Sequence, residues 1–171
     1  IKDTTSPYNW YDLINHRQSF NSLSEKIVTI EDIDACSSYW NDTGLFNDTQ
    51  AHMREFCKDA YQDWGTEYVL LGGNWGTSAA KQCVPFRLFE DRYETLTYDT
   101  MASDLYFSNL DGDFYYSGSG GMFGGRKNSG VNDLFSDLYV GRITAYNDTM
   151  VSNAVQKIIN YDINQNYDNN W

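Results

Sequence analysis

The sequence predicts an α/β fold, in which helices cover both faces of a mostly parallel sheet to give a three-layer sandwich. Residues 68–73, Tyr-Val-Leu-Leu-Gly-Gly, form an apolar run that ends in paired glycines. Such a run is typical of a parallel strand covered on both faces, although a short buried helix remains the alternative. Residues 26–30 predict a second strand and residues 137–143 a third. A helix between the first two of these segments completes a βαβ unit with a right-handed crossover.

Three amphipathic helices are expected around this sheet. The first runs from about residue 8 to residue 18, after an N-cap at Ser6 and a proline at position 7. The second is capped by Asp48 or Thr49 and is closed by Gly65, the favoured residue at the C-terminal end of a helix. Its apolar stripe is expected to face the core and not a cofactor; the stripe comprises Met53, Phe56, Cys57, Ala60, Tyr61 and Trp64. The third follows a cap at residues 147–149, and its apolar face comprises Val151, Ala154, Val155, Ile158 and Ile159.

Length and charge set limits on the function. With 171 residues the chain is expected to form a single α/β domain, residues 1–171, that is large enough to bury a core. A net charge of −12 and a pI near 4.3 argue against binding to nucleic acid, because proteins that bind it carry basic patches. No stretch approaches the roughly 18 apolar residues that a membrane span needs.

One feature of the sequence, its acceptor triplets for N-glycosylation, favours a secreted or cell-surface location. The chain begins Ile-Lys-Asp without a signal peptide, so we expect a processed product or an excised segment. Three Asn-Asp-Thr triplets, starting at Asn41, Asn47 and Asn147, match the acceptor pattern for N-glycosylation. The three cysteines are too few and too scattered for a disulfide framework or a zinc site, and their odd number leaves at least one thiol free.

Residues 101–130 predict an irregular, glycine-rich insertion that carries the one candidate metal site. Asp104, Asn109, Asp111 and Asp113 provide hard oxygen ligands of the kind that calcium takes. Their spacing is not that of an EF-hand loop, and the alternative is a solvated acidic turn. We therefore expect calcium as the only cofactor.

No catalytic residues are predicted. Residues 120–127 lack the Gly-Lys-Ser/Thr of a phosphate loop and follow no strand. His16 and His52 are the only possible bases, and both are expected on the surface. The spacing of His52 and Cys57 on one helix makes their side chains diverge, and no Gly-x-Ser-x-Gly nucleophile motif is present.

Four segments together resemble the gingipain-like cysteine peptidases: Tyr-Val-Leu-Leu-Gly-Gly at 68–73, Val-Pro with arginine at 84–87, Ala-Ser-Asp-Leu-Tyr-Phe-Ser-Asn-Leu-Asp-Gly-Asp at 102–113, and Asp-Leu-Tyr-Val-Gly-Arg-Ile at 137–143. The helix expected at 150–161 also matches the order of this family. The resemblance covers about residues 10–161 and implies the amino-terminal subdomain of a caspase-like peptidase domain.

The resemblance further implies that the catalytic histidine and cysteine follow later strands, outside this chain. The expected role is then to scaffold the catalytic subdomain of the same protein, whose thiolate attacks a peptide carbonyl of a protein or peptide substrate. Two departures are apparent: residues 1–6 are a poor substitute for the family's first strand, and Asn74 and residues 115–121 lack carboxylates that the family often has. The alternatives are a catalytically silent extracellular binding module, calcium-dependent through residues 101–130, and, with least support, a flavodoxin-like nucleotide binder.

Overall fold

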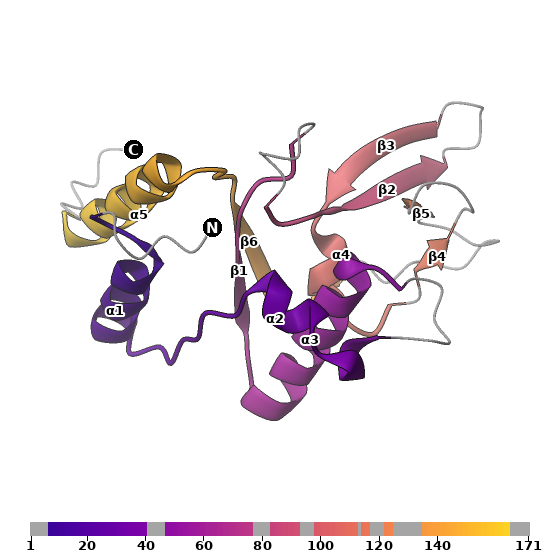
Figure 1. Cartoon of the computed structure of the whole chain (residues 1–171), viewed down its shortest axis with the longest axis horizontal. Helices are drawn as coiled ribbons and strands as arrows, with labels where there is room; N and C mark the ends of the chain where they lie inside the picture. Colours follow the sequence, from indigo (N-terminus) through magenta and orange to yellow (C-terminus); the bar gives the residue numbers. More distant parts are fainter. Residues whose placement is uncertain are drawn as a thin grey trace. The chain divides into compact units, whose positions relative to one another are not determined.

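The structure, a computed structural model, describes residues 7–40, 47–76, 83–92, 98–112, 114–116, 122–124 and 135–164. Its elements are shown in Figure 1. The helices are α1 (Trp10–Asn21), α2 (Ile30–Asp34), the 3-10 helix η1 (Ser37–Tyr39), α3 (Thr49–Trp64), α4 (Leu105–Ser108) and α5 (Asp148–Ile163). The strands are β1 (Tyr68–Gly72), β2 (Arg87–Arg92), β3 (Tyr98–Ser103), β4 (Tyr115–Tyr116), β5 (Met122–Gly124) and β6 (Tyr139–Ile143).

The chain divides into two compact units, and each is described by itself. Unit 1 comprises residues 1–27, 72–83 and 143–171, and unit 2 comprises residues 28–71 and 84–142. The expectation of one domain remains a prediction. Among the described residues, no helix is both long and apolar enough to cross a membrane.

Helix α3 begins and ends where the sequence predicted. The Asp48 carboxylate accepts a hydrogen bond from the Ala51 N–H, which satisfies one of the free donors of the first turn. Gly65 ends the helix with φ of 64°, a left-handed conformation that glycine adopts without steric cost. Along the predicted stripe Met53, Cys57 and Ala60 are buried, whereas Tyr61 and Trp64 are exposed.

Strands β1 and β6 pair in parallel, as the sequence predicted. The Tyr139 N–H donates to the Glu67 carbonyl, and the Asn74 N–H donates to the Ala145 carbonyl. The partner numbers rise together along both strands, which only a parallel register allows. The molecule is therefore a mixed helix and strand fold with a small parallel sheet.

The predicted burial of β1 on both faces is wrong. Val69 and Leu71 pack against the core of unit 2, but Tyr68 and Leu70 remain 60% and 50% exposed. The described sheet has only two strands, so one face of β1 carries the packing. On the exposed face the Tyr68 ring stacks on the Tyr139 ring of β6, at 5.2 Å between centroids.

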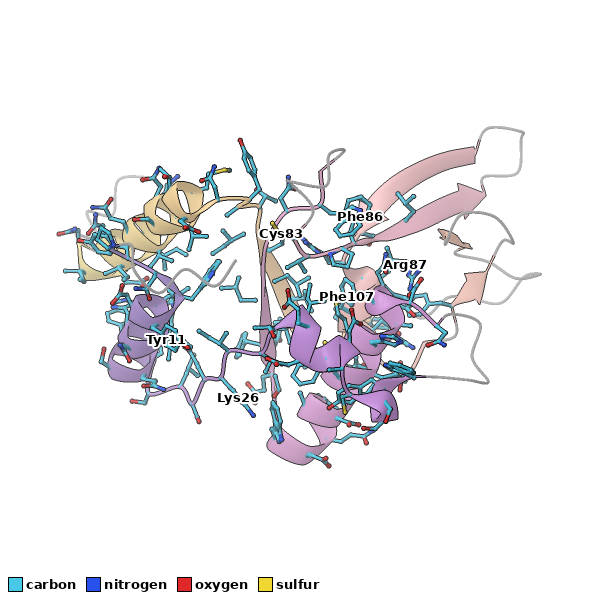
Figure 2. The ribbon with its side chains drawn as sticks, in the orientation of Figure 1. Tyr11, Lys26, Cys83, Phe86, Arg87 and Phe107 are labelled. Atoms are coloured by element: carbon cyan, nitrogen blue, oxygen red, sulfur yellow. The ribbon has the colours of Figure 1, made fainter. Side chains whose placement is uncertain are left out.

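The prediction of a strand at residues 26–30 is also wrong, and so is the predicted βαβ unit from residue 26 to residue 73. Residues 22–29 are an irregular connection between α1 and α2, with Lys26 on it (Figures 1 and 2). Thr29 caps α2 by accepting a hydrogen bond from the Asp32 N–H. Val28 and Ile30 instead pack against the core of unit 2. These β-branched residues therefore contribute to a core without joining a sheet.

A second sheet of four strands, in the order β3-β2-β5-β4, was not predicted. Strand β2 starts directly after Pro85 and Phe86, and pairs antiparallel with β3 and parallel with β5. The expectation of an irregular insertion at residues 101–130 is wrong for residues 101–103, 105–108, 115–116 and 122–124, which are in strands or a helix. Of the glycines in residues 101–130, the structure describes Gly112 and Gly124; the rest lie outside the described residues.

The two units have separate cores. In unit 1 Leu13 of α1 packs with Val151 and Val155 of α5 and with Ala145. In unit 2 the core is formed by residues of α2, α3, β1 and α4; it comprises Ile33, Ala51, Met53, Leu71, Tyr106 and Phe107. Phe107 has no exposed surface, and Figure 2 shows it among these elements.

Candidate functional site

Three of the four predicted calcium ligands lie in the part of the chain that the structure describes: Asp104 directly before α4, and Asn109 and Asp111 after it. Asp104, the first of them, forms a two-pronged ion pair with Arg142 of β6, with N–O distances of 2.7 and 2.8 Å. Arg142 also donates to the carbonyls of Val84 and Pro85, at 2.6 and 3.0 Å. The guanidinium thus joins β6, the turn before β2 and the start of α4. The negative charge of Asp104 is therefore already balanced by the positive charge of Arg142.

Asn109, the second predicted ligand, is completely buried and serves the backbone around it. Its amide nitrogen donates to the Phe135 carbonyl at 3.0 Å, and its amide oxygen accepts from the Gly112 N–H at 2.7 Å. A Cβ added at Gly112 would lie only 2.2 Å from that oxygen, so this close approach requires glycine.

Asp111, the third predicted ligand, is exposed, and Asp113, the fourth, lies outside the described residues. Within the part of the chain that the structure describes, no group of three or more His, Cys, Asp or Glu side chains is placed to hold a metal ion. Calcium binding therefore remains a prediction.

Sequence reasoning missed a buried arginine that supports the segment directly after α4. Arg54 of α3 donates to the carbonyls of Asn109, Leu110 and Gly112, at distances of 2.9 to 3.2 Å. Its guanidinium also lies 4.7 Å from the centre of the Phe114 ring. The sequence did contain a sign of this position: Arg54 precedes Cys57 by three residues, a spacing that places both on the core side of α3.

A second buried arginine anchors the start of α3. Arg87 is 1% exposed and pairs through both terminal nitrogens with the Asp48 carboxylate, at 2.6 and 2.7 Å (Figure 2). Its guanidinium lies 4.5 Å from the centre of the Tyr106 ring. Burial by itself would raise the pKa of Asp48, but the hydrogen bonds from Arg87 and from the Ala51 N–H outweigh it and hold that pKa below its ordinary value.

Both histidines are tied to carboxylates in helix contacts. In unit 1 His16 of α1 hydrogen-bonds Asp162 of α5 at 2.8 Å, and Arg17 pairs with the same carboxylate at 2.9 Å. In unit 2 His52 of α3 hydrogen-bonds Asp34 at 2.7 Å through Nδ1 and Asn47 at 3.0 Å through Nε2. The expectation that both histidines lie on the surface is wrong, since their side chains are 11% and 12% exposed.

The three cysteines lie in different surroundings: Cys57 is buried, and Cys36 and Cys83 are partly exposed. All three are free. Cys57 is buried beside Leu110 and Leu138, and this burial raises its pKa to about 12. Cys36 hydrogen-bonds the Ser38 hydroxyl. The contacts found for His16 and His52 in the described residues include none of these thiols, so the structure assembles no Cys-His pair there.

Comparison with known proteins assigns the family. The family model described as Peptidase family C25 matches residues 9–171. The chain belongs to peptidase family C25. No curated protein and no solved structure matches it. The membership confirms the resemblance to gingipain-like cysteine peptidases that the sequence indicated.

In this C25 chain, the segments that carried the resemblance supply the buried polar contacts. Asp104 and Asn109 belong to one segment, Arg142 to a second and Arg87 to a third. Asp104 pairs with Arg142, Asn109 binds the Phe135 carbonyl, and Arg87 pairs with Asp48, which lies outside these segments. These polar residues therefore fix the local fold, and that is the role the geometry supports.

Proposed function

We propose that this C25 chain is the non-catalytic, amino-terminal subdomain of a secreted gingipain-like cysteine endopeptidase. Its fold would be completed as a three-layer, caspase-like sandwich. It scaffolds a catalytic subdomain of the same protein, which supplies the histidine and cysteine for attack on a peptide bond. Family membership supports the peptidase; the scaffold role is our inference.

The observation that carries the proposal is the use of both histidines as structural ties. A general base must reach the nucleophile through a hydrogen bond or a single water molecule. His16 and His52 instead join helix α1 to α5 and helix α3 to α2, each through an aspartate. The buried Cys57 thiol, with a pKa of about 12, is protonated at neutral pH and is a poor nucleophile.

The scaffold role is supported by the cost of moving three arginines, of which Arg54 and Arg87 are buried and Arg142 is partly buried. Arg54, Arg87 and Arg142 together make at least ten hydrogen bonds to carboxylates and backbone carbonyls of unit 2. A hydrogen bond to a charged group contributes about 1.5–3 kcal/mol, so these contacts together hold the turns in one arrangement. Rigid turns of this kind suit a surface against which another subdomain packs.

The experiment compares residues 1–171 with the longer polypeptide encoded by the same reading frame. The coding sequence is expected to continue into an apolar strand ending in His-Gly and a later strand ending in Cys. Both products are incubated with a fluorescent casein and with a peptidyl chloromethyl ketone, which alkylates activated thiols. We expect cleavage and labelling for the longer product and neither for residues 1–171.

Two results would contradict the proposal. A stop codon directly after Trp171 would favour the silent binding module. Thiol-dependent cleavage by residues 1–171 alone, abolished in a Cys57→Ser variant and unchanged in a Cys36→Ser variant, would place the chemistry in this chain.

Calcium binding at Asp104, Asn109, Asp111 and Asp113 is kept as a second proposal. The exposed Asp111 carboxylate is the group that supports it, although Asp104 would have to leave Arg142. A ligand bound only by the native state raises the melting temperature. We expect a higher Tm in excess calcium than in chelator, and a smaller difference in an Asp111→Asn variant. Equal Tm values would remove calcium from the account.

A further inference from the structure

The triplet Asn-Asp-Thr occurs three times in the chain, at residues 41–43, 47–49 and 147–149. Each copy has the pattern that oligosaccharyltransferases recognise, Asn-x-Ser/Thr. The first copy lies outside the described residues. The second and third have the same sequence and both lie at the start of a long helix: Thr49 is the first residue of α3, and Asp148 is the first residue of α5. Any difference between the two triplets therefore comes from their surroundings.

In the triplet at 47–49 every side chain is held by another part of unit 2. Asn47 is itself exposed, and its amide oxygen accepts from His52 Nε2 at 3.0 Å in a hydrogen bond that is also exposed. The Asp48 carboxylate is clamped by the buried Arg87. The Thr49 hydroxyl donates to the Asp34 carboxylate at 2.9 Å and is partly buried. A transferase would have to break these contacts to reach the asparagine and the threonine together.

The triplet at 147–149 is open to solvent. All three of its residues are exposed. Asn147 has an extended backbone, with φ of −150° and ψ of 166°, and its amide oxygen accepts from the Met150 N–H in a hydrogen bond that is itself exposed. In the described residues we find no hydrogen bond from the Asn147 amide nitrogen or from the Thr149 hydroxyl.

We propose that Asn147 is a site of N-linked glycosylation in the folded chain, and that Asn47 is not. The donor is an oligosaccharide linked through pyrophosphate to a lipid. The Asn147 amide nitrogen forms a bond to C1 of the first sugar while the bond from C1 to the pyrophosphate oxygen breaks. The lipid pyrophosphate leaves with that electron pair, and one amide proton passes to a base of the transferase.

The modification is compatible with helix α5. A sugar on the amide nitrogen leaves the amide oxygen in place, so Asn147 still accepts the Met150 N–H and caps the helix. The helix keeps its buried face of Val151 and Val155. The proposal does not depend on the peptidase assignment, and it would stand for a silent extracellular module as well.

The test uses the purified, folded chain with a single-subunit oligosaccharyltransferase that accepts Asn-x-Ser/Thr and its lipid-linked oligosaccharide. Intact-mass measurement counts the added glycans, and peptide mapping assigns them. We expect Asn147 to be modified at least tenfold faster than Asn47. Synthetic peptides 44–52 and 144–152 are run in parallel, and we expect their rates to agree within about threefold, because only the fold separates the two sites.

Variants test the assignment at Asn147. Thr149→Ser keeps the acceptor pattern and should be modified; Thr149→Ala removes it and should not. Asn147→Asp removes the acceptor nitrogen but still caps the helix, so it should stay folded and lose the glycan. Similar rates at Asn47 and Asn147 in the folded chain would overturn the proposal. So would an unmodified Asn147, whether or not its peptide is accepted.

Discussion

The two units solve the problem of a stable interior in different ways. Unit 1 packs the apolar faces of α1 and α5 and links the two helices through His16 and Arg17, which both contact Asp162. Unit 2 buries Arg54, Arg87 and Asn109, whose side chains form hydrogen bonds with the Asp48 carboxylate and with backbone groups. Apolar packing tolerates small changes of shape. A buried polar group that loses its hydrogen-bond partner, by contrast, destabilises the fold by the full cost of removing that group from water. We therefore expect unit 2 to be the less tolerant of substitution.

The largest effect is expected for Asn109→Ala in unit 2. Alanine leaves the Phe135 carbonyl and the Gly112 N–H without the amide that bonds them, and it opens a cavity at a site with no exposed surface. We expect a loss of about 3 kcal/mol in the free energy of unfolding, measured by urea denaturation. Asn164→Ala, which removes an exposed amide bonded to Asn160, is the control and should cost less than about 0.5 kcal/mol. Equal losses would show that the buried amide has no special role.

A smaller loss is expected for Val155→Ala in unit 1. Val155 is completely buried in the contact between α5 and α1, and its truncation removes two methyl groups from that core. The cost is about 2 kcal/mol, below that of Asn109→Ala, because no polar group is left without a partner. Ile163→Ala, at a residue of α5 that is 65% exposed, is the matched control and should have little effect. A Val155→Ala loss above that of Asn109→Ala would reverse the comparison between the units.

The sequence predicts the apolar elements better than the polar ones. Helices α3 and α5 could be placed because their caps, Asp48, Gly65 and Asn147, are local and their apolar stripes are continuous. Strand β6 was found for a similar reason, as a short apolar run. The prediction of a strand at residues 26–30 failed because β-branched residues favour an extended backbone but do not show that a neighbouring strand is present to pair with it.

The buried polar centre could not be predicted from residue type alone. Arginine and asparagine are usually exposed, so Arg54 and Asn109 resemble surface residues until their partners are known. Those partners are distant in sequence: Arg54 binds carbonyls about 55 residues away, and His16 and Asp162 are separated by 146 residues. Candidate calcium ligands were chosen for their oxygen atoms, yet two of them turn out to have protein partners.

A third prediction concerns the pH dependence of the Asp48–Arg87 pair in unit 2. The pKa of Asp48 is lower in the folded chain than the ordinary value of 3.8, so the pair stabilises the fold fully above pH 3.8. This contribution is lost as the pH falls further, through the folded pKa. Asp48→Asn keeps the helix cap but removes the negative charge that faces the Arg87 guanidinium. We expect it to lower the free energy of unfolding by roughly 1–2 kcal/mol at pH 7.

The measurement is the free energy of unfolding of both proteins between pH 7 and pH 2.5. The difference between them should be constant above about pH 5 and shrink below pH 3.8. Asp111→Asn, at an exposed carboxylate, is the control and should show no such convergence. A difference that stays constant down to pH 2.5 would mean that Arg87 is held by contacts other than the Asp48 charge.

The last prediction concerns Cys57 in unit 2, and it is tested by the rate at which the thiol is labelled. Burial raises the pKa of this thiol to about 12, so the folded chain prefers the neutral form. Its contribution to stability is present below the ordinary value of 9.0 and is lost as the pH rises from there towards 12. At pH 8 iodoacetamide should therefore label Cys36 and Cys83, which are partly exposed, at least a hundredfold faster than Cys57. In 8 M urea all three should react at similar rates. Rapid labelling of Cys57 in the folded chain would show that α3 opens readily there, and unit 2 would then be the more adaptable of the two.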